Sequence, residues 1–73
     1  VIVYPNPSND FIQVKADTNI KQIELFDIQG RILETLTQNE NAVKFNISNK
    51  TNGIYFLRIT TQKGTKIEKI VKK

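Results

Sequence analysis

GIYFLRIT, residues 53–60, carries an apolar side chain at every second position from Tyr55 onward. Side chains along a β-strand point alternately to opposite faces, so Tyr55, Leu57 and Ile59 would share one face and Arg58 would lie on the other. Apolar residues along the chain recur mostly with a period of two, which is the mark of half-buried strands and not of helices. The pattern therefore predicts a strand with one face in a hydrophobic core.

The same period of two recurs on both sides of this stretch. It is clearest at Val43, Phe45 and Ile47, which alternate with polar residues. Short strands at near-regular spacing, separated by turn residues, are typical of β-sandwiches and small barrels. The sequence thus predicts an all-β fold, an Ig-like β-sandwich of about seven short antiparallel strands, with the other six strands near residues 1–4, 12–14, 20–27, 31–37, 43–47 and 65–71.

Turn residues separate these strands. Asp27 followed three positions later by Gly30 is typical of a bulged hairpin, in which the Asp caps the turn and the Gly takes a positive φ angle. Pro5-Asn6-Pro7 removes two amide donors and fixes two φ angles, so the first strand should end at Tyr4.

Composition sets the size and class of the protein. With 73 residues, the chain is long enough for one domain, residues 1–73, and too short for two. Strand-like sequence begins at the first residue, so we expect a domain excised from a larger protein. The net charge of +4 is concentrated after Arg58. No apolar run approaches the ~20 residues of a membrane span, so no membrane insertion is expected.

The residues that carry most enzyme chemistry are missing. The chain has no His and no Cys, which removes the usual general base, the strongest nucleophile and the commonest metal ligands. Asp10, Asp17 and Asp27 are isolated in sequence and are expected in turns and at the surface. No Gly-Lys phosphate loop is present. We predict a domain that is not an enzyme and holds no metal or cofactor.

A nucleic-acid interface is an alternative reading of the basic end. Lysines after Arg58 could meet phosphates while Tyr4, Phe26 or Phe56 supplied stacking surface. Lysines on terminal strands also keep sheet edges soluble and prevent aggregation, and this is the preferred interpretation. We expect no nucleic-acid partner.

Phe56 lies on the face opposite Tyr55 and Leu57, and in a sandwich one of these faces should be solvated. Either Phe56 packs under a loop, which is the preferred reading, or it marks an exposed patch used for binding.

Several motifs together resemble a known family. In chain order they are YPNP at residues 4–7, LFDIQGR at 25–31, GIYFLRI at 53–59 and KIVKK at 69–73. Each motif alone is weak, but their order and spacing, and their extent over essentially the whole chain, resemble the type A C-terminal sorting domain of the type IX secretion system.

The resemblance implies an Ig-like sandwich that follows an N-terminal cargo domain in a secreted protein. It implies passage through the periplasm and outer membrane to the cell surface or medium. The partners would be the type IX machinery, namely an outer-membrane shuttle and a sortase that removes the domain, so that catalysis belongs to the sortase. Whether isolated domains pair through edge strands stays open.

The resemblance also implies a set of site residues, and it links the last strand to recognition by the secretion machinery. Physically, an edge strand with free backbone groups and a basic rim can be read by strand addition and charge. The glycines and Pro7 could instead only build turns. The matching residues are Pro5, Asn6, Pro7, Asp27, Gly30, Arg31, Gly53, Tyr55, Lys69, Lys72 and Lys73.

A second function class is an Ig-like or fibronectin-like binding or spacer module, which would hold carbohydrate or protein for a surface enzyme. The basic end at Lys72-Lys73 separates the two readings, because a terminal address needs such an end and a spacer does not.

Overall fold

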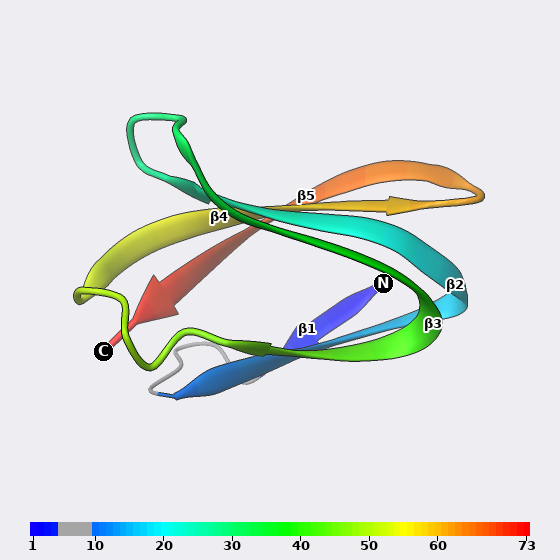
Figure 1. Cartoon of the computed structure of the whole chain (residues 1–73), viewed down its shortest axis with the longest axis horizontal. Helices are drawn as coiled ribbons and strands as arrows, with labels where there is room; N and C mark the ends of the chain where they lie inside the picture. The colour runs from blue at the N-terminus through cyan, green and yellow to red at the C-terminus, as the bar shows by residue number, and fades with distance from the viewer. Residues whose placement is uncertain (5–9) are drawn as a thin grey trace.

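The computed structural model describes residues 1–4 and 10–73, and all of the regular structure in this part of the chain is β-strand. The strands pair only in the antiparallel sense. Figure 1 shows their arrangement. None of the described residues lies in a helix able to cross a membrane. In chain order the strands are β1 (Ile2–Tyr4), β2 (Phe11–Asp27), β3 (Ile32–Asn46), β4 (Gly53–Thr61) and β5 (Gly64–Lys72).

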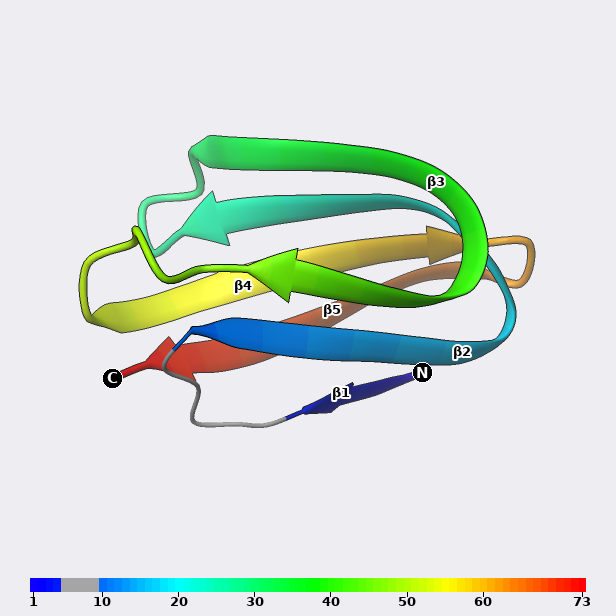
Figure 2. The ribbon, with the colours of Figure 1, turned by 60° about the horizontal axis from the view of Figure 1, so that its bottom comes forward.

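β2 and β3 pair with each other along most of their lengths and bend together. The first half of β2, Phe11 to Lys15, pairs with the end of β3, and the second half, Ile20 to Phe26, pairs with its beginning. The register shifts between Lys15 and Ile20, which marks the bend. In Figure 2 both strands curve round together at the right of the view.

The bend folds one sheet into two layers. β1 pairs with the first half of β2, and β4 pairs with the second half and carries β5 on its far side. One layer therefore contains β1, the start of β2 and the end of β3, and the other contains the start of β3, the end of β2, β4 and β5. The predicted all-β antiparallel sandwich is confirmed, although the seven predicted segments form five continuous strands.

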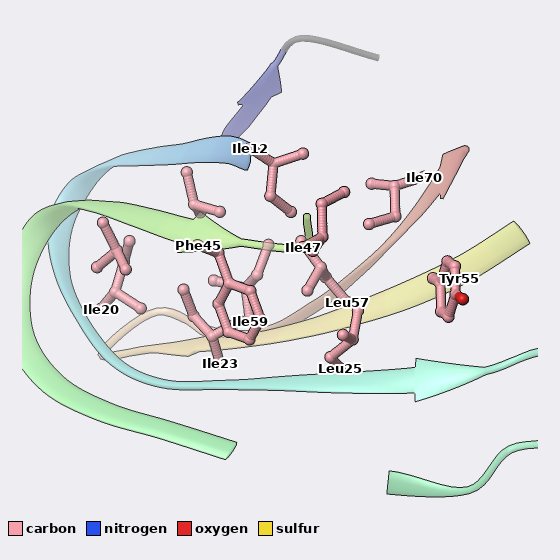
Figure 3. Close-up of a cluster of buried hydrophobic side chains, with 12 residues drawn as sticks. Ile12, Ile20, Ile23, Leu25, Phe45, Ile47, Tyr55, Leu57, Ile59 and Ile70 are labelled. Atoms are coloured by element: carbon pink, nitrogen blue, oxygen red, sulfur yellow. The ribbon is translucent and has the colours of Figure 1, made fainter. Parts of the chain in front are cut away.

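Apolar side chains from both layers fill the space between them (Figure 3). The three alternate residues of β4 point inward, as their spacing predicts, and so do alternate residues in both halves of β2, at the end of β3 and at the end of β5. Val3, Ala16 and Leu36 pack against the margin. The buried core residues are Ile12, Val14, Ile20, Ile23, Leu25, Val43, Phe45, Ile47, Tyr55, Leu57, Ile59 and Ile70.

Candidate recognition site

The turn between β2 and β3 is held by one carboxylate. Asp27 Oδ1 accepts hydrogen bonds from the backbone amides of Gln29 and Arg31, at 2.9 and 3.0 Å. Its Oδ2 accepts from Arg31 Nε at 2.8 Å. The Gly30 amide donates to the Asp27 carbonyl, and Gly30 has φ +87°, the positive angle that the motif predicts. All three residues predicted for the central motif, Asp27, Gly30 and Arg31, therefore help to build the turn.

Asp27 is ionised at lower pH than a free aspartate. The backbone amide of Arg31 donates to the carboxylate and holds the Asp27 pKa below its usual value, and the Arg31 guanidinium acts in the same direction. At the opposite end of the sandwich, the hydrogen bond and charge of Lys63 lower the pKa of Asp17 in the same way. Both carboxylates are thus charged at neutral pH, and Asp27 keeps its turn closed.

The start of β4 lies directly beside this turn. Tyr55 is the register partner of Asp27, and its hydroxyl donates to the Thr51 carbonyl at 2.6 Å. This bond ties the loop before β4 to the core, because the Tyr55 ring is one of the buried side chains. A pocket of about 260 Å³ lies between the two motifs, lined in part by Asp27, Arg31, Gly53 and Tyr55.

The last strand ends at the same place. Lys72 of β5 pairs with Gly53, and Ile70 pairs with Tyr55. Lys69 and Lys73 are exposed, but Lys72 is on the core-facing side and buried, with Nζ donating to the Lys73 carbonyl at 3.1 Å. The predicted basic rim is therefore corrected: Lys69 and Lys73 supply its exposed charge, and Lys72 packs inward because β5 continues its alternation past Ile70.

The opening motif cannot be placed. Pro5, Asn6 and Pro7 lie outside the described residues. β1 ends at Tyr4, as the sequence predicts, and β2 begins at Phe11.

The described motif residues lie close together because β2 bends, and its second half pairs with β4, which in turn pairs with β5. The end of β2, the start of β4 and the end of β5 lie together at the left of Figure 2. We call this region, formed by residues 27–31, 51–55 and 69–73, the motif end. Within the described part of the chain, no cluster of three or more His, Cys, Asp or Glu could hold a metal ion. What the motif end offers a partner is shape, charge and the edge strand β5.

Comparison with known protein families identifies the family of the chain. The family described as "Secretion system C-terminal sorting domain" matches residues 2–73, which is all but the first residue of the chain. The chain belongs to this family. No curated protein matches it.

Membership establishes the general role of the protein. It is a C-terminal sorting signal for type IX secretion, and it leads to export through the outer membrane to the cell surface or the medium. Sorting domains of this family act with the type IX machinery and are in general not catalytic. The resemblance inferred from the motifs is confirmed.

The sorting domain also has a feature that the sequence motifs do not single out, on the outer face of the layer formed by β2, β4 and β5. Phe26 and Phe56 are register partners there, and both are partly exposed. They line a shallow pocket of about 360 Å³. We call Phe26, Ile28, Phe56, Arg58 and Ile67, which share its lining with Asp27 and Gly30, the apolar patch. Phe56 thus fits the exposed-patch alternative and not the preferred position under a loop.

An ion pair borders this patch. Arg58 Nη2 lies 2.7 Å from Glu24 Oε1, and Nε of the same guanidinium donates to that oxygen. The guanidinium also lies over the Phe26 ring, 5.1 Å from its centre. Glu24 and Arg58 are register partners on neighbouring strands. A signal was available in the sequence, because Glu24, Phe26, Phe56 and Arg58 all fall on the faces opposite the core residues.

Proposed function

We propose that the outer-membrane shuttle of the type IX system reads this sorting domain at the motif end, and that the surface sortase then removes the domain from its cargo. The observation that carries the proposal is the convergence of the central hairpin, the start of β4 and the end of β5 on one end of the sandwich. A single receptor surface could contact all of them together.

β5 is the element best suited to direct recognition. Among the described strands it pairs only with β4, so it forms an edge of the sheet. The exposed side chains of such a strand can be recognised by a receptor through their charge. Lys69 and Lys73 give this edge exposed positive charge at the motif end.

In sortase processing, the sortase and not the domain carries out the cleavage. In this proposal the domain is the leaving part of the substrate, and the cut lies on the cargo side of Val1 or in the linker before it. The folded sandwich keeps the recognition elements together until release.

Charge reversal at the β5 edge tests whether the shuttle recognises the motif end. A reporter fused to the domain carries either Lys69→Glu with Lys73→Glu, or Lys21→Glu with Lys63→Glu as a control. Both pairs change the net charge equally, and the control lysines lie away from the motif end. We expect export of the first variant to fall about tenfold and that of the control to stay near wild type, because a reversed rim charge slows encounter and weakens docking.

The readout has two parts. Fractionation of a type IX-competent cell gives the exported share, and the mass of the exported reporter tells whether the 8.4 kDa domain has been removed. Circular dichroism of the purified variants checks that both are folded. Equal export of the two variants would contradict reading at the β5 edge. Deleting residues 70–73 is a poorer test, since it removes Ile70 from the core.

A further inference from the structure

We propose that the apolar patch is a docking surface for an extended acidic peptide, which inserts one apolar side chain between Phe56 and Ile67. This face borders the motif end and shares with it the exposed Lys69. The inference concerns binding by the isolated domain and does not depend on export.

The patch is apolar where it meets solvent. Ile28 and Ile67 are 67% and 63% exposed, and they flank the partly exposed Phe26 and Phe56. Ile32, the register partner of Phe26 on β3, adds another exposed aliphatic side chain. Large apolar side chains gathered around a hollow, in contrast to ones scattered singly, indicate an interaction site. The hollow of about 360 Å³ gives a partner's side chain a place to enter.

The exposed charge around the patch is positive. In the Arg58–Glu24 pair the Arg side chain is 42% exposed and the Glu 10%, and in the Arg31–Asp27 pair the values are 72% and 14%. In both pairs the acid is covered and the cation faces solvent. Lys69, the register partner of Phe56, is also exposed. A partner that approaches this face therefore meets cations first, which favours acidic residues beside its apolar anchor.

The same charges argue against a second copy of the chain as the occupant. Each copy carries a net charge of +4 and the same exposed cations, so two patches brought together would repel.

The surface also fits a peptide better than a nucleic acid. Base stacking needs an open aromatic face, but the Arg58 guanidinium lies over the Phe26 ring, and the most exposed members of the patch are aliphatic. An extended peptide can place one aliphatic anchor in the hollow while its acidic residues lie beside the exposed cations.

Titration of the isotope-labelled 73-residue domain tests this inference by nuclear magnetic resonance. The principal probe is a synthetic peptide with one central leucine flanked by aspartates. Its matched partners replace the aspartates by asparagines or by lysines. We expect the aspartate peptide to bind at least about tenfold more tightly than either partner, with shifts centred on the apolar patch and affinity that falls as salt is added.

A pair of isoleucines with equal exposure supplies the variant and its control. Ile67 in the patch and Ile2 on β1 are both 63% exposed. Threonine keeps the β-branched shape that strands favour. Ile67→Thr should weaken the aspartate peptide by about threefold to tenfold, while Ile2→Thr leaves it unchanged. Phe56→Thr, checked for folding by its spectrum, should weaken it further.

Several results would overturn the inference. One is equal binding of the three peptides, and another is equal affinity of the Ile67→Thr and Ile2→Thr variants. A third is tighter binding at the patch by oligothymidylate or by phosphatidylglycerol vesicles, which would assign the surface to a nucleic acid or a membrane. Export of the reporter is not involved, so failure here leaves the motif-end proposal unaffected.

Discussion

Leu57→Ala should remove most of the free energy of unfolding of the domain. Leu57 lies in the middle of β4, pairs with Leu25 and is fully buried between the two layers. Removing a buried leucine side chain to alanine costs about 2–5 kcal/mol, part of it from the cavity that remains. A core in so small a domain supplies only about 3–5 kcal/mol in total, and with no Cys in the chain there is no disulfide to offset the loss.

Urea denaturation followed by circular dichroism measures this effect. Ile28→Ala is the matched control, because it also shortens an aliphatic side chain but at a position that is mostly exposed in the turn after β2. We expect the control to stay within about 0.5 kcal/mol of wild type. A Leu57→Ala variant that lost less than about 1 kcal/mol would show that the core does not have the described packing.

Gly30→Val should destabilise the hairpin at the motif end through backbone strain. Gly30 has φ +87°, which a β-branched residue adopts only with strain. No atom outside its immediate chain neighbours lies within 4 Å of the position that an added Cβ would take, so the cost comes from the backbone and not from a clash. A strained conformation of this kind costs about 1–3 kcal/mol.

Gly30→Asn separates the backbone effect from the mere addition of a side chain. Asparagine tolerates positive φ better than other residues, so its urea midpoint should lie between those of wild type and Gly30→Val. The valine should also weaken the hydrogen bonds that Asp27 accepts from the turn amides. Equal midpoints for the valine and asparagine variants would contradict this account of the turn.

The period of two predicted most of the fold. The inward face of β4 follows from the spacing of Tyr55, Leu57 and Ile59 alone, and all three are buried. The continuity of β2 was not predictable in the same way. KADTN, residues 15–19, interrupts the alternation and looks like a loop, whereas β2 passes through it with a shift of register. A bend in a paired strand depends on its partner β3, and a local pattern does not contain that information.

The site was predictable in parts. Asp27 and Gly30 form the turn that their spacing indicates, since turn geometry is local. The meeting of that turn with the start of β4 and the end of β5 needed the strand order. Burial of Lys72 follows from its two-residue spacing from Ile70, but its charge suggested a surface position. The Phe26–Phe56 pair required the cross-strand register, which sequence spacing does not supply.

The central claim is that this domain by itself addresses a cargo to the type IX system. The most direct measurement fuses it to the end of a folded periplasmic reporter and compares surface and medium fractions in a type IX-competent cell and in the same cell without the machinery. Leu57→Ala in the fusion shows whether the folded sandwich is required. We predict export of the intact fusion in the competent cell alone and retention of the reporter without the domain. An intact fusion that stays in the periplasm of the competent cell, with the domain folded, would contradict the claim and favour a binding or spacer module.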